Sequence, residues 1–192
     1  VHLLGYSMGG RLALATALAE ANSGRVASLT LLGAHPGLLT PKERWDREQA
    51  DCERAARLES AGLATFLDEW YRMPLFAPAR AALGRRRLME RRRGGRPEAL
   101  AAALRTVSTG RMPNLRPGLH HLRIPVLVLA GLLDEKFHLL GRDLAAAIPG
   151  SRFAAVPDAG HSLLVEAPAQ CAALWTEFIA QQSLSINRED PS

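Results

Sequence analysis

Three side chains of this sequence, Ser7, Asp134 and His161, are of the types that make a base-activated nucleophile. A serine hydroxyl is almost fully protonated at neutral pH, so it needs a base within hydrogen-bond reach, and histidine can serve as that base. The second ring nitrogen of the histidine needs a carboxylate, which fixes the tautomer and stabilises the imidazolium. Because the three residues are far apart along the chain, the chemistry requires a fold that brings them together.

Ser7 lies at the centre of the run GYSMG, residues 5–9, between a short apolar segment and an Ala/Leu-rich one. This order predicts a strand, a sharp turn with the serine at its apex, and a helix over residues 8–22. We expect a strained backbone at Ser7, and we expect side chains at Gly5 and Gly9 to collide with the neighbouring strand and helix. The backbone N–H of Met8 is then the expected oxyanion donor. An ordinary glycine-rich turn is the alternative.

Asp134 and His161 each follow a predicted strand. Residues 124–131 form an apolar run typical of a strand buried on both faces, and residues 151–156 form a shorter one. Strands that alternate with helices predict a parallel sheet, whose sites form at the carboxyl ends of the strands. Ser7, Asp134 and His161 therefore meet at one edge. Two alternatives remain for the acid: Asp134 only begins a helix, or Asp158 takes its place.

The chain divides into four predicted segments. Residues 1–39 and 119–182 form the core, residues 40–118 form a helical cap, and residues 183–192 form a flexible tail. Within the cap, Thr40 and Pro41 open a helix, and Pro97 opens another. Such insertions are commonly lids over a site. A single amphipathic helix is expected over residues 162–182.

Composition excludes several classes of protein. The net charge is +5, but the arginine-rich run at residues 85–96 lacks interleaved aromatic residues, so we expect a solvated helix face rather than a nucleic-acid site. The six histidines show no metal-ligand spacing, and no metal or cofactor is expected. Cys52 and Cys171 are interpreted as reduced cysteines of an intracellular protein. No apolar run approaches the ~20 residues of a membrane span.

The first residues indicate part of a longer protein, because the chain begins at Val1 inside a predicted strand. We expect the N-terminal strands of the sheet, and the loop with the second oxyanion donor, to be missing. The first strand would then have an unpaired apolar edge, which favours aggregation. The 192-residue chain alone is expected to be poorly soluble and inactive.

Several longer motifs carry a resemblance to one family: GYSMGGRLAL at 5–14, HPGL at 35–38, EWYRMPLF at 69–76, LAAALRTVSTGRMPNL at 100–115, LDEKF at 133–137 and AGHSLLVEAP at 159–168. The sequence resembles the 2-succinyl-6-hydroxy-2,4-cyclohexadiene-1-carboxylate synthases of menaquinone and phylloquinone biosynthesis. The resemblance extends from the strand–turn–helix segment around Ser7, called the elbow below, to the C-terminus. The resemblance implies an α/β-hydrolase fold with a helical cap. It also implies a lyase that eliminates pyruvate from 2-succinyl-5-enolpyruvyl-6-hydroxy-3-cyclohexene-1-carboxylate.

The same resemblance implies roles for individual residues. Ser7, activated by His161 and Asp134, would abstract a proton. The carboxylates of the substrate would be bound by arginines, and the pocket would be completed by aromatic side chains; the matching residues are Arg11, Arg47, Arg92, Tyr6 and Trp70. The sequence departs from the family at Leu39, where some members have a polar pocket residue, and at Leu132-Leu133, where a more polar turn is usual.

Two other functions stay open. The first is a generic α/β-hydrolase, an esterase or C–C hydrolase with a helical cap, because it would share Ser7, Asp134 and His161. The second is an inactive, truncated chain. For the synthase we expect a small polycarboxylate substrate, no nucleic-acid partner, and a location in the cytoplasm, or in the plastid of a photosynthetic eukaryote.

Overall fold

The structure, a computed structural model, describes residues 1–186 and divides into two compact units. Unit 1 combines residues 1–35 with the chain from Gly118 onward, and unit 2 comprises Pro36–Pro117. The tail expected over residues 183–192 lies, from residue 187 on, outside the described residues, and the backbone up to Ile186 continues the last helix.

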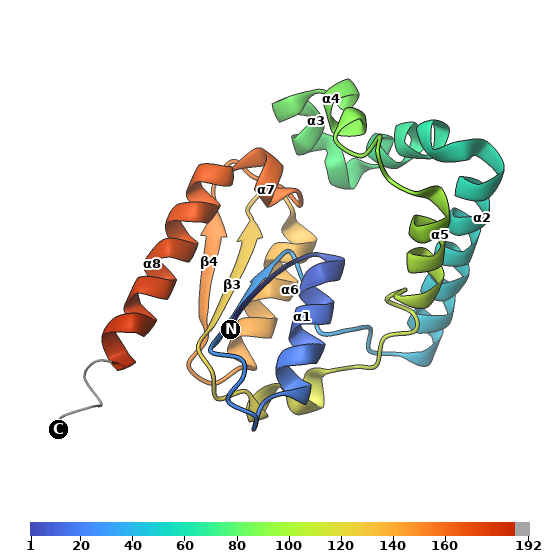
Figure 1. Ribbon diagram of the computed structural model, residues 1–192. Coiled ribbons are helices and arrows are strands. Elements are labelled where there is room, and N and C mark those ends of the chain that lie inside the picture. The colour runs from blue at the N-terminus through green and yellow to red at the C-terminus, as the bar shows by residue number, and fades with distance from the viewer. Residues whose placement is uncertain (187–192) are drawn as a thin grey trace. The chain divides into compact units, whose positions relative to one another are not determined.

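Unit 1 is built on a parallel sheet of four strands in the order β1-β2-β3-β4 (Figure 1). The strands are β1 (His2–Tyr6), β2 (Ser28–Leu32), β3 (Val126–Gly131) and β4 (Arg152–Val156). Across the sheet, Gly5 pairs with Leu31, Leu31 with Val128, and Val128 with Phe153. This register brings the carboxyl ends of the four strands to one edge. The predicted parallel sheet is therefore confirmed.

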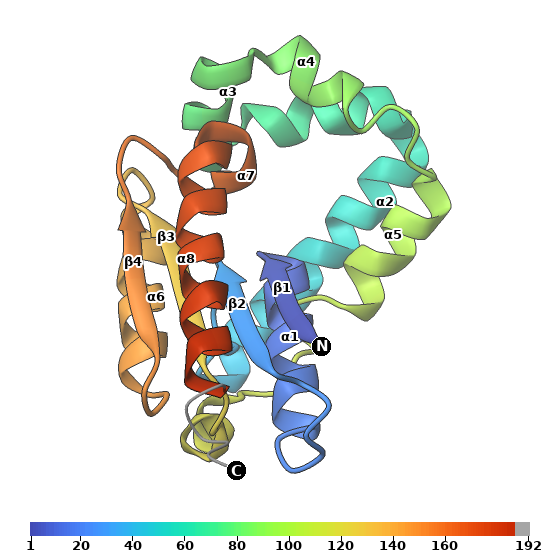
Figure 2. The same ribbon diagram turned by 60° about the vertical axis from the view of Figure 1, so that its left-hand side comes forward.

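Helices cover both faces of this sheet (Figure 2). Helices α1 (Met8–Ala19) and α6 (Glu135–Ala146) pack on one face, and α8 (Pro168–Ile186) packs on the other. All residues of β2 and β3 are buried, as their continuous apolar runs predict. β1 lies at the edge of the described sheet, and its Leu4 is 45% exposed.

The single helix predicted over residues 162–182 is wrong. Two helices stand there, α7 (Leu163–Glu166) and α8, with Ala167 outside helical geometry at φ −140° and ψ 54°. Pro168 explains the break, because a proline disfavours the helical conformation at the preceding residue. The same proline occupies the first position of α8, where its missing N–H leaves no helical hydrogen bond unmade.

The structure describes all of residues 36–117, and the regular elements of unit 2 are helices. Its elements are α2 (Pro41–Arg72), the 3₁₀ helix η1 (Pro74–Phe76), α3 (Ala77–Leu83), α4 (Arg85–Glu90) and α5 (Pro97–Thr106), and a second 3₁₀ helix, η2 (Arg116–His121), spans the boundary with unit 1. α2 is bent at Gly62, whose φ of 78° and ψ of 163° are not helical. This glycine therefore divides α2 into two helical parts that meet at a kink.

The start of α2 is a complete capping box, as Thr40 and Pro41 led us to expect. The Thr40 hydroxyl accepts from the Glu43 N–H at 3.1 Å, and the Glu43 carboxylate accepts from the Thr40 N–H at 2.8 Å. Two backbone donors that a helix start leaves without partners are satisfied in this way. Such a cap stabilises a helix by about 1 kcal/mol.

A buried acid joins distant parts of unit 2. Asp51, 2% exposed on α2, accepts hydrogen bonds from Arg47 at 2.8 Å and from Arg54 at 2.7 Å. It also accepts from the Ser108 hydroxyl at 2.7 Å, and Ser108 follows α5. A carboxylate can accept about four hydrogen bonds, so this one group can hold α2 and the segment after α5 together.

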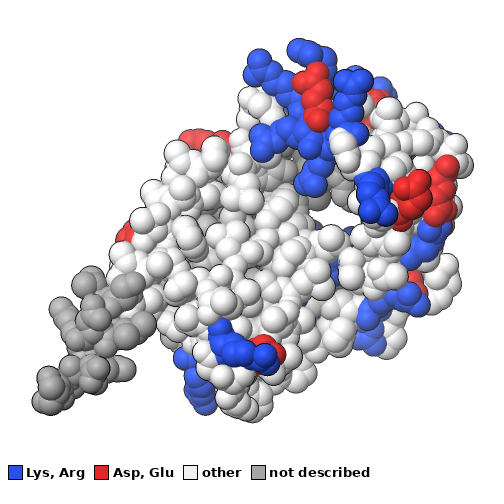
Figure 3. Space-filling view, in the orientation of Figure 1, with Lys and Arg blue, Asp and Glu red and all other residues white. Residues whose placement is uncertain are grey.

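The arginine-rich run lies on the surface of unit 2. Figure 3 shows basic side chains gathered over the region of α3 and α4, with an acidic group among them. Every arginine of the run 85–96 is exposed, and Arg86 pairs with Glu90 one turn away. A solvated helix face agrees with this exposure. Within residues 1–186, none of the helices has both the length and the apolar character needed to cross a bilayer.

Candidate functional site

Ser7 stands at the turn between β1 and α1 in a strained conformation. Its φ of 50° and ψ of −111° lie outside the regions that non-glycine residues normally occupy. The Ser7 N–H donates to the Leu32 carbonyl at 2.8 Å, which ties the turn to the end of β2. Within the described residues the Ser7 side chain caps none of the N–H groups of α1, so its hydroxyl is available for another partner.

The predicted steric collisions at the glycines of this turn are present at Gly5 but not at Gly9. A Cβ on Gly5 would lie 2.5 Å from the Gly9 carbonyl oxygen and 2.6 Å from the Gly10 Cα, so the predicted collision is present there. At Gly9 the prediction is wrong, because none of the described atoms lies within 4 Å of an added Cβ. The second close approach belongs instead to Gly10, whose Cβ would lie 2.7 Å from the Ala34 Cβ.

Ser7, His161 and Asp134 form a chain of hydrogen bonds within unit 1. His161 Nε2 lies 3.1 Å from Ser7 Oγ, and His161 Nδ1 lies 3.0 Å from Asp134 Oδ2. His161 is 3% exposed and Asp134 is 9% exposed, so the ring and the carboxylate are largely shielded from water. This is the geometry that a histidine base needs in order to take the serine proton while a carboxylate supports its other nitrogen.

Asp134 has both of the functions that the sequence left as alternatives. Its Oδ2 faces His161, while its Oδ1 accepts from the Phe137 N–H at 3.2 Å and caps α6. A carboxylate has two oxygens, so one side chain can start a helix and orient a ring. The rival Asp158 is exposed in the turn after β4 at φ 56°, and His161 Nδ1 pairs with Asp134 instead.

Two glycines allow the loop with His161 to approach the strand ends. Gly33 follows β2 at φ 53°, and a Cβ there would lie 3.2 Å from the His161 Cε1. At Gly131, the last residue of β3, a Cβ would overlap the carbonyls of Ala159 and Gly160. The loop is further fixed to this edge because the Leu133 N–H donates to the Ala159 carbonyl at 2.9 Å.

Sequence reasoning missed Gly33 and Gly131 as residues that shape the site. Each glycine directly follows or ends an apolar strand, and that position is the signal by which they could be found. A glycine at the end of a buried strand often marks a place where another backbone or a ring passes closely. The identity of the passing group is set by residues far along the chain, so a local pattern does not show it.

Aromatic side chains enclose the His161 ring. The Phe137 ring centroid lies 4.3 Å from that of His161, and the Tyr6 centroid lies 5.5 Å from it. The Tyr6 hydroxyl lies 3.5 Å from the Ser162 hydroxyl, at the limit of a hydrogen bond. Tyr6, predicted as a pocket residue, is therefore beside His161 and half-buried.

The two other predicted site residues of unit 1 lie on α1. Met8 is the first residue of this helix, so its backbone N–H belongs to the group that has no acceptor within the helix. Such N–H groups and the helix dipole favour negative charge near Ser7. Arg11 lies one turn further on, and it is 8% exposed, so this arginine contributes little to the surface.

The remaining predicted residues belong to unit 2. Arg47 uses its Nε to pair with the buried Asp51, and its side chain is 42% exposed. Trp70 lines a cavity of about 350 Å³ on α2 and stacks on Phe66 at a centroid distance of 5.7 Å. Arg92 is exposed in the turn after α4.

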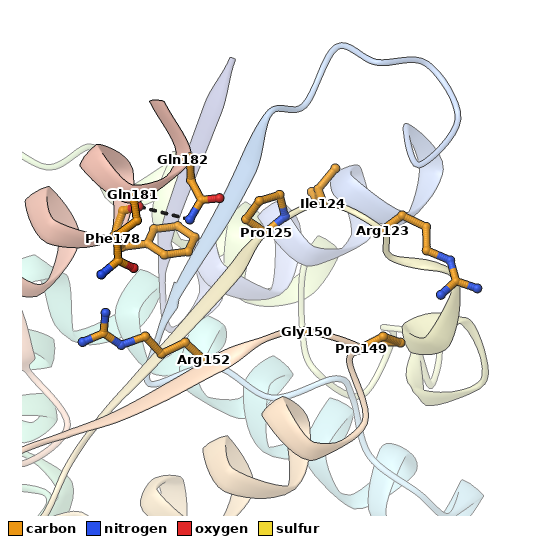
Figure 4. Close-up of a pocket in the computed structure, with 9 residues that line it drawn as sticks. All are labelled: Arg123, Ile124, Pro125, Pro149, Gly150, Arg152, Phe178, Gln181 and Gln182. Carbon is orange, nitrogen blue, oxygen red and sulfur yellow. Dashed lines mark hydrogen bonds between the residues drawn. The ribbon is translucent and has the colours of Figure 1, made fainter. Parts of the chain in front are cut away.

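Figure 4 shows the residues that line a cavity of about 300 Å³ in unit 1. Its walls come from the segments before β3 and β4 and from α8; the lining residues are Arg123, Ile124, Pro125, Pro149, Gly150, Arg152, Phe178, Gln181 and Gln182. These segments lead into the amino ends of the strands, whereas Ser7, Asp134 and His161 stand past the carboxyl ends. The cavity is therefore at the opposite edge of the sheet.

Comparisons with known proteins agree with this architecture. The alpha/beta hydrolase family matches residues 1–174. A Bacillus subtilis protein with the name of a 2-succinyl-6-hydroxy-2,4-cyclohexadiene-1-carboxylate synthase is 35% identical over 181 residues, which are 93% of this chain and 65% of that protein. The synthase of Pectobacterium atrosepticum is 36% identical over 178 residues, with 93% of this chain and 68% of that protein covered.

Solved structures show the same similarity. MenH from S. aureus superposes with a TM-score of 0.86 at 33% identity, covering 95% of this chain and 68% of that one. A thermophilic esterase from Thermogutta terrifontis, with malate bound, gives a TM-score of 0.77 at 25% identity, covering 95% and 65%. The chain spans about two thirds of the length of the relatives that it matches. It belongs to the alpha/beta hydrolase family and, within it, to the 2-succinyl-6-hydroxy-2,4-cyclohexadiene-1-carboxylate synthases.

Proposed function

We propose that the protein eliminates pyruvate from 2-succinyl-5-enolpyruvyl-6-hydroxy-3-cyclohexene-1-carboxylate. The observation that carries this proposal is the identity of 35–36% with two proteins named as the synthase, over 93% of the chain. The hydrogen-bonded Ser7, His161 and Asp134 support it, because the reaction begins with the removal of a proton and needs a base. Since the chain spans about two thirds of its relatives, the activity is assigned to the whole protein.

The arrangement suggests the following sequence of proton and electron movements. His161 accepts the Ser7 proton, and the serine oxygen removes the proton from ring carbon 2, next to the succinyl carbonyl. The electron pair forms the bond between carbons 2 and 3, the existing double bond shifts to carbons 4 and 5, and the bond from carbon 5 to oxygen breaks. The enolpyruvate that leaves becomes pyruvate on protonation, and the ring becomes the 2,4-diene.

The same proposal assigns a function to Met8. Removal of the proton at carbon 2 places negative charge on the succinyl carbonyl oxygen. The Met8 N–H at the start of α1 would donate to that oxygen, with the helix dipole adding to the effect. Loss of one such donor costs about 10²–10³-fold in rate in a comparable site.

The binding of the substrate carboxylates remains part of the proposal. Arginine holds carboxylates through two parallel hydrogen bonds, and the resemblance assigns this function to Arg11, Arg47 and Arg92. Arg47 already supplies Nε to Asp51, so its terminal nitrogens would make the contact to substrate. Tyr6 and Trp70 are proposed to line the pocket. A location in the cytoplasm is proposed because the similar proteins are bacterial biosynthetic enzymes.

The test is release of pyruvate by the whole protein from the enolpyruvyl substrate, measured with lactate dehydrogenase. Ser7→Ala is expected to lower kcat by at least about 10³-fold, since removal of the serine from such a unit has costs of this order or larger. Glu177→Gln, on the surface of α8, is the matched control and is expected to keep the wild-type rate. Pyruvate release that persists in Ser7→Ala would contradict the mechanism.

Ester hydrolysis is the second candidate, favoured by the likeness to the Thermogutta esterase. The same three residues would serve it, with Ser7 attacking a carbonyl instead of removing a proton. Rapid turnover of p-nitrophenyl esters by the whole protein, together with a lack of pyruvate release, would establish this function in place of the elimination.

A further inference from the structure

Glu166, at the end of α7, has both carboxylate oxygens directed at the backbone around His161. Oε1 accepts from the Ser162 N–H at 3.1 Å, and Oε2 accepts from the Gly160 N–H. These two N–H groups belong to the residues that directly precede and follow His161. We call the arrangement of Glu166, Gly160 and Ser162 the carboxylate bracket.

The bracket is closed by hydrogen bonds in the opposite direction. The Ser162 carbonyl accepts from the Val165 N–H at 2.8 Å and from the Glu166 N–H at 3.0 Å. Ser162 is therefore bound to the α7 turn through both its N–H and its carbonyl. The Ser162 N–H is part of the peptide unit that follows His161, so the ψ angle of His161 is restricted by this contact.

The His161 ring is constrained from its other sides by contacts already described. Asp134 holds Nδ1 at 3.0 Å, Gly33 leaves little room beside Cε1, and Phe137 packs at 4.3 Å. These contacts fix the ring only while its Cα stays in place. The bracket is the contact that fixes the backbone on both sides of that Cα.

We propose that Glu166 is a positioning residue, which holds the backbone at His161 so that Nε2 stays within reach of Ser7 while Nδ1 faces Asp134. This inference rests on the base function of His161 in the proposed function. A charged carboxylate accepts backbone N–H groups more strongly than a neutral group does. A glutamine has one acceptor oxygen and one donor nitrogen, so it can complete only half of the bracket.

The variants that test this are Glu166→Gln and Glu166→Asp in the whole protein. Glu177→Gln is the matched control, because it makes the same change of charge on the neighbouring α8, where Glu177 pairs with Arg152. The shorter aspartate keeps the charge but reaches less far, so we expect it to restore part of what glutamine loses. Thermal unfolding and circular dichroism confirm the fold of each variant.

The first measurement is independent of the substrate. A low-field proton resonance is expected from the hydrogen bond between His161 Nδ1 and Asp134 in the wild type and in Glu177→Gln. In Glu166→Gln we expect this resonance to broaden or vanish, because a mobile His161 exchanges its proton with water. An unchanged resonance in Glu166→Gln would overturn the proposal.

The second measurement is the rate at which a fluorophosphonate labels Ser7, together with kcat and KM for pyruvate release. Glu166→Gln is expected to lower the labelling rate and kcat by about 10- to 100-fold, the effect of a small displacement in a catalytic group. KM and the melting temperature should stay near wild type. A labelling rate within about twofold of wild type would contradict the bracket.

The outcomes separate this inference from the proposed function. A wild-type protein that shows the resonance and labels at Ser7, but releases no pyruvate, would contradict the elimination. The positioning function of Glu166 would still be tested by the resonance and the labelling rate of the Glu166 variants. If Glu166→Gln does not fold, the resonance and the labelling rate of Glu166→Asp test the proposal in its place. An intermediate labelling rate in folded Glu166→Asp supports the bracket, and a wild-type rate with a wild-type resonance overturns it.

Discussion

The acidic side chains at the strand ends of unit 1 and those between the helices of unit 2 have different partners. Asp134 accepts from a histidine ring and a backbone N–H, and Glu166 accepts from two backbone N–H groups. In unit 2, Asp51 and Glu59 accept from arginines. The first arrangement fixes the direction of one ring. In the second, Glu59 joins α2 to α5 through Arg105, and Asp51 joins α2 to the segment after α5 through Ser108. The same residue type thus serves orientation in one unit and packing in the other.

Two exposed arginine–glutamate pairs of unit 2 are sensitive to acid. The Arg105 hydrogen bonds hold the pKa of Glu59 below its ordinary value, and Arg57 does the same for the pKa of Glu69. A lowered pKa in the folded state means that the stabilisation is present above the ordinary pKa of glutamate and is lost as pH falls through the lowered one. Both pairs are exposed, so salt also weakens them.

The largest predicted effect is that of Asp134→Asn at the strand ends. The asparagine oxygen can still cap α6, but its amide nitrogen would face His161 Nδ1 and favour the wrong tautomer. We expect kcat to fall by about 10³–10⁴-fold with little change in melting temperature. Asp158→Asn is the control, because Asp158 is the exposed rival acid. Equal losses of kcat in Asp134→Asn and Asp158→Asn would contradict a special function of Asp134.

The next largest effect is expected on the stability of unit 2, from substitution of Asp51. Asp51→Ala leaves Arg47, Arg54 and Ser108 without their shared acceptor, and we expect the free energy of unfolding to fall by about 2 kcal/mol. Asp46→Ala removes an exposed pair with Lys42 on the same helix and should cost less than about 1 kcal/mol. Denaturant titration measures both. Similar losses would show that burial of Asp51 contributes nothing.

A smaller effect is expected from Gly33→Ala, with Gly24→Ala as its control. Both glycines have positive φ, 53° and 68°, so each alanine should destabilise the fold by about 1 kcal/mol. Only the Cβ at position 33 would contact His161; at position 24 none of the described atoms lies within 4 Å. We therefore expect labelling of Ser7 to slow by about 10-fold in Gly33→Ala alone. Equal rates in the two variants would contradict a steric function of Gly33.

The smallest effect compares one thiol of each unit. Burial raises the pKa of Cys171 above its ordinary value of 9.0, whereas Cys52 is half-buried on α2. Iodoacetamide in the folded protein should modify Cys171 more slowly than Cys52, as measured by mass spectrometry. Because the folded state retains the Cys171 proton, its contribution to stability is present below the ordinary pKa and declines as pH rises above it. Faster modification of Cys171 would indicate that α8 opens readily.

Local patterns in the sequence predicted the strands, the elbow and the first helix of unit 2, because each depends on neighbouring residues. Thr40 and Pro41 are an example, since a helix start is encoded within a few positions. The close approach at Gly33, the bracket at Glu166 and the burial of Asp51 depend on residues far along the chain. The break at Pro168 is encoded locally by the proline, but the apolar periodicity of residues 162–182 alone favours one continuous helix.

In the proposed mechanism, Asp134 would link the stability of the fold to the chemistry at Ser7. The carboxylate that supports His161 also begins α6, so fraying of the first turn of that helix would release the support as well. On heating, catalysis would then decline before the sheet melts, and the temperature of inactivation would report on a single helical turn. A substitution that strengthens this turn would extend the working range of the enzyme without touching the substrate.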